Sequence, residues 1–460
     1  MAENRPVEPR EIRDWQGRSY RVGEDPRDLI GWPRWSMAAL AWVAMAAVGM
    51  LQYGYGAAVP ALMARNGWSP VEAFWPLAGW VVFQAGVGWP AAYLLARRRV
   101  GSRVLVLAGA VCCELGVLAL AHSTSLVIVV IGYSVVGGTG AGLVYAACTT
   151  TVARWYPERS GVRVGQVTGA FAYGSAPVAV VVVLVLRPES VLPALQTTSV
   201  MIFMLVAAAG LSFVDPPARW WPADVDPRAW ALGGGHNAGR RRNPSAVREF
   251  STTQALRTRA LPLMVLILMC AGAVSLFDAV FLVVIAQGLG LGVTVTAAAA
   301  GLILGFNGAA RALALGLSDR FGRCRTLSGV LAVQAVGQVV FAVAVITAAP
   351  AAMIAAAVLA GLGGGAFYPL FASLAREYFG EERAFEVHGV VYSAKAGSGV
   401  LGIGLAASAM TAWGPSTTFL LAAVIAASSA WAATTLRRPG LLSMLPTAAP
   451  RRPAALDITA

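Results

Sequence analysis

Apolar stretches of membrane-spanning length alternate with short polar connections along nearly the whole chain. Each stretch is close to the roughly 20 apolar residues that a helix needs to cross the hydrocarbon core of a membrane. We therefore predict an all-α, polytopic membrane protein with twelve transmembrane helices. The expected helices cover residues 35–59, 73–96, 104–121, 126–152, 164–186, 196–214, 261–287, 293–317, 326–347, 351–374, 387–411 and 415–436.

A long polar segment in the middle of the chain separates two sets of six expected helices. It is rich in turn-forming residues and arginine, which is typical of a linker rather than of a membrane span. The expected organisation is a cytoplasmic N-terminal tail (1–34), a six-helix bundle (35–214), a cytoplasmic linker (215–260), a second six-helix bundle (261–436) and a cytoplasmic C-terminal tail (437–460).

Composition and charge agree with this organisation. The chain is 57% hydrophobic and only 12% charged, with a formal net charge of +13. Most of its basic residues fall in the segments that a cytoplasmic N-terminus would place inside, as the positive-inside rule requires. The first expected helix follows a polar tail without the apolar core of a signal peptide. We expect a multi-pass, monomeric protein of the cytoplasmic membrane with both termini cytoplasmic, whose basic surface faces acidic lipid rather than nucleic acid.

The chain shows no residue pattern typical of an enzyme or a metal site. Its five cysteines lack the spacing of metal ligands, and its three histidines are scattered. No serine or cysteine has a base at motif spacing. We therefore predict no enzyme activity, no metal and no cofactor.

Two basic residues lie inside expected helices instead of in the connections. Lys395, the only lysine in the protein, lies in the stretch 387–411, and Arg311 lies in an earlier helix. A charge at membrane depth costs several kcal/mol unless it faces protein or water, so it marks a functional site by default. The alternative is a structural cation paired with a buried carboxylate. Glu114 and Asp278 lie within expected helices, and either could be a counter-ion or a proton site.

The two halves resemble each other in sequence. The segment ARWYPERSGVRVGQVTGAFAYG (153–174) follows the fourth expected helix, and AREYFGEERAFEVHGVVYSAKAG (375–397) follows the tenth. Glycine-rich runs also recur, GGTGAG at 137–142 and GLGGGA at 361–366. Because these runs lie within membrane helices, they favour close helix packing over nucleotide binding. Repeated halves are typical of alternating-access transporters with a site between the halves.

The connection between the eighth and ninth expected helices carries a motif. GLSDRFGRCRT (316–326) resembles the cytoplasmic-loop signature of the major facilitator superfamily, in which this loop acts as a gate. The resemblance assigns the gating positions to Asp319, Gly322 and Arg323. The corresponding first-half loop, LLARRRVGSR, has Arg98 where an aspartate is expected.

Within that superfamily the chain resembles the oxalate:formate antiporter family. The resemblance is carried by QYGYGAAVPAL with NGWS, GGTGAGLVYAACTTTVARWYPERSG, FNGAARALALGLSDRFGR and YSAKAGSGVLG. In that family an arginine of the eighth helix and a lysine of the eleventh hold the carboxylate substrate. The matching positions here are Arg311 and Lys395. By the same resemblance, tyrosines line the cavity, although each has an equally good role in helix packing: Tyr53, Tyr55, Tyr145, Tyr173, Tyr368 and Tyr392.

The resemblance implies a secondary transporter of small carboxylates that works by anion exchange. Arginine offers a planar fork to one carboxylate and lysine a mobile point charge to the other. Proton-coupled uptake of monocarboxylates and efflux of a larger organic acid or drug are alternatives, as is a membrane sensor. The sequence does not choose among the small acids.

Overall fold

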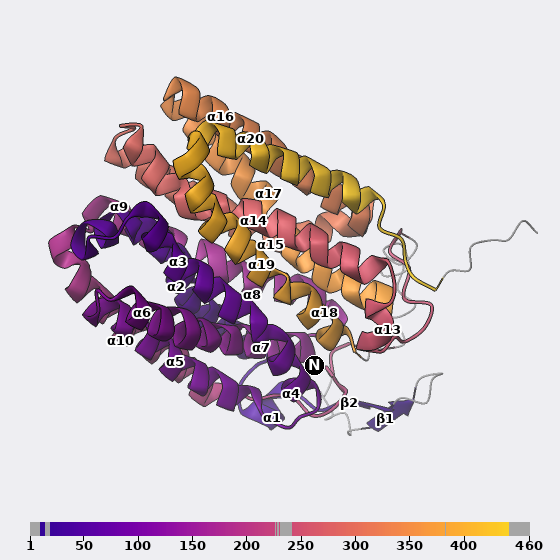
Figure 1. Cartoon of the computed structure of the whole chain (residues 1–460). Coiled ribbons are helices and arrows are strands. Elements are labelled where there is room, and N and C mark those ends of the chain that lie inside the picture. The colour runs from indigo at the N-terminus through magenta and orange to yellow at the C-terminus, as the bar shows by residue number, and fades with distance from the viewer. Residues whose placement is uncertain are drawn as a thin grey trace, which may run out of the picture.

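In the computed structural model, the chain is almost entirely helical, and its helices form two groups that lie side by side (Figure 1). The structure describes residues 10–13, 19–225, 227, 230, 242–381 and 383–440. Most of the expected C-terminal tail and parts of the N-terminal tail and central linker lie outside the described residues.

The first group contains the helices between residues 35 and 212. A short helix, α1 (Pro26–Ile30), precedes it. Its helices are α2 (Trp35–Asn66), α3 (Pro70–Gly86), α4 (Gly88–Ala96), α5 (Ser102–His122), α6 (Leu126–Val129), η1 (Val130–Gly137), α7 (Gly138–Trp155), η2 (Pro157–Arg159), α8 (Ser160–Tyr173), α9 (Ala176–Val185), η3 (Pro188–Ser190) and α10 (Val191–Ser212).

The second group follows a short linker helix, α13 (Thr252–Leu256). Its helices are α14 (Ala260–Gly288), α15 (Val293–Phe321), α16 (Arg323–Thr347), α17 (Pro350–Phe379), α18 (Ala384–Ser393), α19 (Lys395–Gly399), η4 (Val400–Leu405) and α20 (Ala406–Thr434).

Ten helical stretches of the described chain are long and apolar enough to cross a membrane. Two local breaks explain why this number differs from the expected twelve. The stretch formed by α3 and α4 is divided at Val87, which leaves two short helices. The last stretch, Ala384–Thr434, contains a corner at Gly414, whose φ of 76° is not helical. The expected arrangement of twelve helices in two halves fits this fold.

A small sheet was not expected in a protein predicted to be all-α. It joins β1 (Arg10–Arg13), β2 (Ser19–Val22) and β3 (Trp220–Trp221) in that order. The β1–β2 pair is antiparallel and the β2–β3 pair is parallel. Trp220 also packs edge-on against Trp155 of α7, with a centroid distance of 5.0 Å, and its indole nitrogen donates to the Glu24 carbonyl oxygen at 3.2 Å. The linker thus lies beside both α7 and the N-terminal segment. We call this end of the molecule the tail end and the opposite one the far end.

The glycine-rich runs permit close helix packing, as the sequence indicated. A side chain on Gly140 would lie 2.8 Å from the carbonyl oxygen of Gly109 on α5. One on Gly363 would lie 2.5 Å from the backbone nitrogen of Gln334 on α16. These distances leave no room for a β-carbon, so the two helix pairs can approach only because of glycine.

The halves contact each other at both ends. Toward the far end, Phe74 of α3 stacks on Phe281 of α14 at 4.0 Å between ring centroids. Toward the tail end, Arg376 of α17 donates to Ser160 of α8 at 2.8 Å. These contacts lie on opposite sides of the helix centres, so the halves touch on both sides of the middle of the bundle.

Candidate functional site

Lys395 lies between the halves and is held by the half to which it does not belong. It begins α19, directly after the break between α18 and α19, and its side chain is 3% exposed. Its Nζ donates to the side-chain oxygens of Gln52 on α2, at 2.8 Å, and Gln84 on α3, at 3.0 Å. Lys395 therefore links the last helices of the chain to the first ones.

Arg311 crosses the same boundary from α15 and is also 3% exposed. Its Nε and Nη2 donate to Asn307 Oδ1 at 3.2 and 2.9 Å. In the other half, its Nη1 donates to the Thr168 carbonyl oxygen at 3.0 Å and its Nη2 to the Tyr53 hydroxyl at 3.1 Å. The guanidinium also lies 4.7 Å from the centre of the Tyr368 ring. The arginine fork is thus fixed on several sides.

Aromatic rings connect the two cations into one cluster. The Lys395 amine lies 5.3 Å from the Phe171 ring centre and 5.7 Å from that of Tyr392. Tyr392 stacks on Tyr145 at 4.7 Å, and Tyr145 meets Phe171 edge-on. The faces of such rings carry partial negative charge, which favours a nearby cation. We call Arg311, Lys395 and the rings of Tyr53, Tyr145, Phe171, Tyr368 and Tyr392 the central cluster.

Neither cation of the central cluster has a carboxylate partner within the described chain. Their partners are amide, carbonyl and hydroxyl oxygens, which carry no full charge. Removing an ion from water costs several kcal/mol, and neutral oxygens repay only part of that cost. The cluster therefore holds two basic groups without a carboxylate that would neutralise them.

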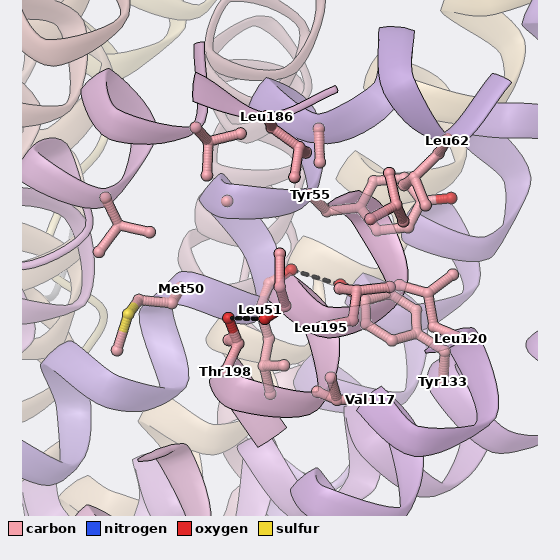
Figure 2. Close-up of a pocket in the computed structure, with 16 residues that line it drawn as sticks. Met50, Leu51, Tyr55, Leu62, Val117, Leu120, Tyr133, Leu186, Leu195 and Thr198 are labelled. Atoms are coloured by element: carbon pink, nitrogen blue, oxygen red, sulfur yellow. Dashed lines mark hydrogen bonds between the residues drawn. The ribbon is translucent and has the colours of Figure 1, made fainter. Parts of the chain in front are cut away.

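Four of the six nominated tyrosines lie in the central cluster, and two do not. The Tyr55 hydroxyl donates to the carbonyl oxygen of Ala73 at 2.7 Å, and its ring packs on Tyr133. It borders a separate apolar cavity of about 70 Å³ between α2, α9 and α10, where leucine and valine side chains surround it (Figure 2). Tyr173 donates to the Gln166 carbonyl oxygen and accepts from Trp42. Both phenols are thus satisfied in helix packing.

Five residues of the site were missed. They are Gln52, Gln84, Asn307, Thr168 and Phe171, which contact the two cations directly. An amide side chain in an apolar helix is a weak indication of a site, because many satisfy themselves locally. A stronger indication was present for Gln52 and Asn307, since each lies beside or one turn from a nominated residue.

Asp278 does not pair with either cation in this structure. It is 2% exposed, and its Oδ2 accepts from Gln338 Nε2 on α16 at 2.7 Å. The counter-ion role expected for Asp278 therefore finds no support in these contacts. Glu114 lies on α5, partly buried, and forms no ion pair with a described residue.

Two ion pairs of Arg323 hold the loop after α15. Arg323 pairs with Asp319 at 2.8 Å and with Glu377 of α17 at 3.0 Å. Gly322 has a φ of 93°, which a residue with a side chain adopts only with strain. The amide of Arg323 at the start of α16 donates to Asn243 at 2.9 Å.

The first-half loop replaces its absent aspartate with one from the linker. Asp215 accepts from the backbone amide of Ser102 at 3.1 Å and from the Thr151 hydroxyl at 2.9 Å. It also pairs with Arg154 at 3.4 Å. A carboxylate from elsewhere in the chain thus occupies the start of α5, where the positive end of the helix dipole favours it.

Comparison with known proteins places the chain in a broad family. A family model described as Major Facilitator Superfamily matches residues 41–317 and 263–457. The oxalate:formate antiporter of Oxalobacter formigenes is 24% identical over 287 residues, which are 62% of this chain and 64% of that protein. The match thus spans just under two thirds of that relative. An uncharacterized 38 kDa protein in the 23S RNA operon of Thermoproteus tenax is 26% identical over 326 residues, 70% of this chain and 74% of that protein.

Solved transporter structures have the same fold. A mutant of the nucleoside transporter NupG aligns with a TM-score of 0.60 and 11% identity, covering 88% of this chain and 99% of that one. The human organic anion transporter MFSD10 (TETRAN) aligns with a TM-score of 0.55 and 13% identity, covering 87% and 100%. A POT family transporter in complex with 5-aminolevulinic acid aligns with a TM-score of 0.60 and 12% identity, covering 86% and 94%. At these identities the likeness is one of fold.

Proposed function

This chain belongs to the major facilitator superfamily of membrane transporters, and on that premise we propose that it carries small carboxylate anions by alternating access. The observation that carries the proposal is the pair of buried cations, Arg311 and Lys395, without a carboxylate partner in the described chain. An anion that enters the central cluster would supply the missing charge. A cationic substrate would meet repulsion there.

The two cations suit the two ends of a small dicarboxylate. The fixed fork of Arg311 can donate two parallel hydrogen bonds to one carboxylate. Lys395 can turn its amine from Gln52 and Gln84 to the other carboxylate, because an ammonium has no preferred plane. The flat faces of Tyr145 and Tyr392 would cover the apolar faces of a planar anion.

The same charges favour exchange over net transport. An empty cluster keeps two like charges in a low-dielectric environment, and a bound dianion neutralises them. The conformational change is therefore easier for the loaded carrier than for the empty one, since a ligand shifts the equilibrium only by its differential affinity. We expect the two bundles, 35–214 and 261–436, to move about the cluster in a monomer, with the tail end and both termini in the cytoplasm.

Counterflow in proteoliposomes tests the proposal. Vesicles loaded with one acid from a panel of oxalate, formate, malonate and pyruvate should take up the same labelled acid faster than unloaded vesicles. Arg311→Lys keeps the charge and removes the fork, so dicarboxylate counterflow should fall by about tenfold or more. Arg257→Lys, at an exposed arginine beyond α13, is the matched control and should keep wild-type rates. Uptake of a neutral or cationic solute, with no carboxylate exchanged, would refute the proposal.

Asp278 favours a second candidate function, proton-coupled uptake of a monocarboxylate. Asp278 Oδ1 and Gln338 Oε1 are both buried without a hydrogen-bond partner in the described chain, although Oδ2 and Nε2 of the same pair are bonded. Two acceptors without a donor are costly in a buried site. A proton on Oδ1 would supply the donor, and a carboxyl that holds a proton in one conformation can release it in another.

The two candidate functions differ in what drives uptake: an opposing anion gradient in the first and a proton gradient in the second. Vesicles without internal anion should take up labelled monocarboxylate when the outside is made acidic. Asp278→Asn replaces the proton with a permanent N–H donor, so it should abolish this uptake and leave counterflow intact. If wild-type uptake does not depend on the pH gradient, the second candidate function is wrong.

A further inference from the structure

A polar cavity lies at the tail end, away from the central cluster. It has a volume of about 750 Å³ and forms where α15 ends, α16 begins and the linker returns to the bundle. Its lining includes a phenylalanine, a leucine, a glutamate and five arginines. The arginines are Arg242, Arg320, Arg323, Arg325 and Arg438.

Positive charge in this arginine cavity exceeds negative charge. Glu377, the carboxylate in the lining, pairs with Arg323, and Asp319 pairs with the same arginine. No ion pair among the described residues reaches the other four arginines. Two of them are held by backbone carbonyl oxygens, Arg242 by that of Arg320 and Arg438 by that of Ser245. Such bonds orient the side chains without neutralising them.

The start of α16 adds backbone donors to the same cavity. Asn243 accepts from the Arg323 amide, and the Thr326 amide donates to the Gly322 carbonyl oxygen. The amides of Cys324 and Arg325 lie between them in the first turn, where a helix has no acceptors of its own. Nothing in the described chain accepts from these two amides. A helix start combined with several arginine forks favours a group with several anionic oxygens.

An apolar stripe leads from the membrane to this cavity. Leu313, Leu317 and Phe321 recur at intervals of four residues on α15, so they share one face. Their exposed fractions are 68%, 46% and 59%, and Phe321 also lines the cavity. Exposed apolar side chains on a membrane helix face lipid, so a lipid whose headgroup entered this cavity would have its acyl chain along the stripe.

We propose that the arginine cavity binds a phosphate group, and that the stripe on α15 assigns this group to the headgroup of an anionic phospholipid. The headgroup would contact Arg320, Arg325 and the first turn of α16. The lipid would then sit beside the 316–326 loop that connects α15 and α16. This site is separate from the central cluster and does not depend on the identity of the transported substrate.

The test is thermal unfolding of the full-length protein in nanodiscs of defined lipid. Nanodiscs that contain phosphatidylglycerol should raise the unfolding midpoint of the wild type by several degrees over nanodiscs of phosphatidylcholine alone. The double variant Arg320→Gln, Arg325→Gln should lose most of this rise. The matched double variant Arg257→Gln, Arg259→Gln removes the same charge from exposed arginines near the start of α14 and should keep the rise. The single variant Arg325→Gln, at an exposed side chain, gives a second measurement should the double variant fold poorly.

Two further measurements, in detergent without lipid, decide whether the bound phosphate group belongs to a lipid or to a soluble molecule. Neither inorganic phosphate nor ADP should raise the midpoint beyond the effect of sodium chloride at equal ionic strength. A phosphate-specific rise that the Arg325→Gln variant loses would keep the phosphate site and overturn its assignment to lipid. If the Arg320/Arg325 and Arg257/Arg259 variants lost the phosphatidylglycerol-dependent rise in midpoint equally, the rise would come from general surface charge. That result would overturn the proposal.

Discussion

Arg311 and Lys395 are bound in different ways, although both are buried cations at the boundary between the halves. Arg311 has four hydrogen bonds and an aromatic ring against its guanidinium. Lys395 has only two hydrogen bonds, to the side-chain oxygens of Gln52 and Gln84, and its amine lies farther from the nearest ring centres, at 5.3 and 5.7 Å. We infer that Arg311 is the fixed part of the anion site and Lys395 the part that moves when an anion binds.

Lys395→Ala should abolish dicarboxylate exchange while leaving the protein folded. One carboxylate of the substrate would be desolvated without a cation, a loss on the order of 2–5 kcal/mol in transport affinity. A monocarboxylate needs one cation and should lose less. Counterflow of labelled oxalate and formate, with expression and monodispersity as controls, measures both effects.

The double variant Lys395→Ala, Asp278→Ala distinguishes substrate binding from a structural ion pair. Because Asp278 bonds to Gln338 rather than to Lys395, neutralising it should not restore exchange. Recovery of exchange in the double variant would show that the lysine balances the aspartate in the working protein.

A carboxylate placed beside Lys395 should act as a permanent competitor of the substrate. In Gln84→Glu the new carboxylate would take the position of an oxygen now 3.0 Å from the amine and form a buried ion pair. We expect counterflow to fall by at least tenfold with normal expression. Gln196→Glu, at an exposed glutamine of α10, is the control and should behave as wild type. Unchanged exchange in Gln84→Glu would place the substrate elsewhere.

Much of the central cluster could be predicted from the sequence, and the rest depends on how the helices are rotated against one another. Arg311 and Lys395 were identified because a charge is conspicuous in an apolar helix. Tyr53 and Tyr55 differ by two positions, which is about 200° around a helix, so only one of them faces Arg311. Which of the two it is depends on the rotation of α2 against its neighbours. Gln52 and Gln84 contact Lys395 only when α2, α3 and α19 pack together, and no pattern within a single helix predicts that contact.

At the scale of elements, α5 and α16 hold equivalent positions in the two halves, and the first residue of each is hydrogen-bonded to a side chain of the linker. Asp215 bonds to the first residue of α5, and Asn243 bonds to the first residue of α16. The linker therefore attaches to each half separately at the tail end. In the second half, the motif aspartate Asp319 also forms an ion pair with Arg323, the first residue of α16.

Asp319→Asn should slow turnover with little effect on substrate affinity. The change removes one charge from the pairing around Arg323 but leaves Glu377 in place. Asp319 lies roughly 12 Å along α15 from Arg311, too far to contact a small anion there. Concentration dependence of counterflow should show a lower maximal rate and a half-saturating concentration changed by less than about threefold. A change confined to half-saturation would instead place Asp319 in the binding site.

Helix ends were harder to predict than helix existence. The first expected helix stops at residue 59, before Pro60, whereas α2 continues to Asn66. Proline interrupts helices in water, but in a membrane bundle the freed backbone groups find other partners. The small sheet was also missed, because β3 is two tryptophans in a polar linker and acquires its partner from a distant segment.

At the scale of the molecule, contacts on both sides of the central cluster indicate an enclosed conformation. Such contacts must open in turn, one side at a time, for a substrate to cross. The orientation of the two ends in the membrane is then a prediction of its own, set by the excess of arginine at the tail end.

Cysteine accessibility tests that orientation in a background without the five native cysteines. Single cysteines at Arg99 and Glu381, exposed positions of the tail end, should resist a membrane-impermeant thiol reagent in intact cells. Cysteines at Thr124 and Glu189, exposed loop positions of the far end, should react. Permeabilised cells provide the control, since all four should then react. Labelling of Arg99→Cys in intact cells would invert the topology.

The single lysine makes the central cluster chemically unique within the protein. Apart from the N-terminus, the ε-amine of Lys395 is the only primary amine in the chain, and it is 3% exposed. Reductive methylation with ¹³C-formaldehyde should therefore place one lysine resonance in the NMR spectrum of a 460-residue membrane protein. The rate of methylation would report how often the central cluster opens to water, and a bound acid should slow it. The chemical shift of the methylated amine would then follow the arrival of each anion at the site without any engineered probe.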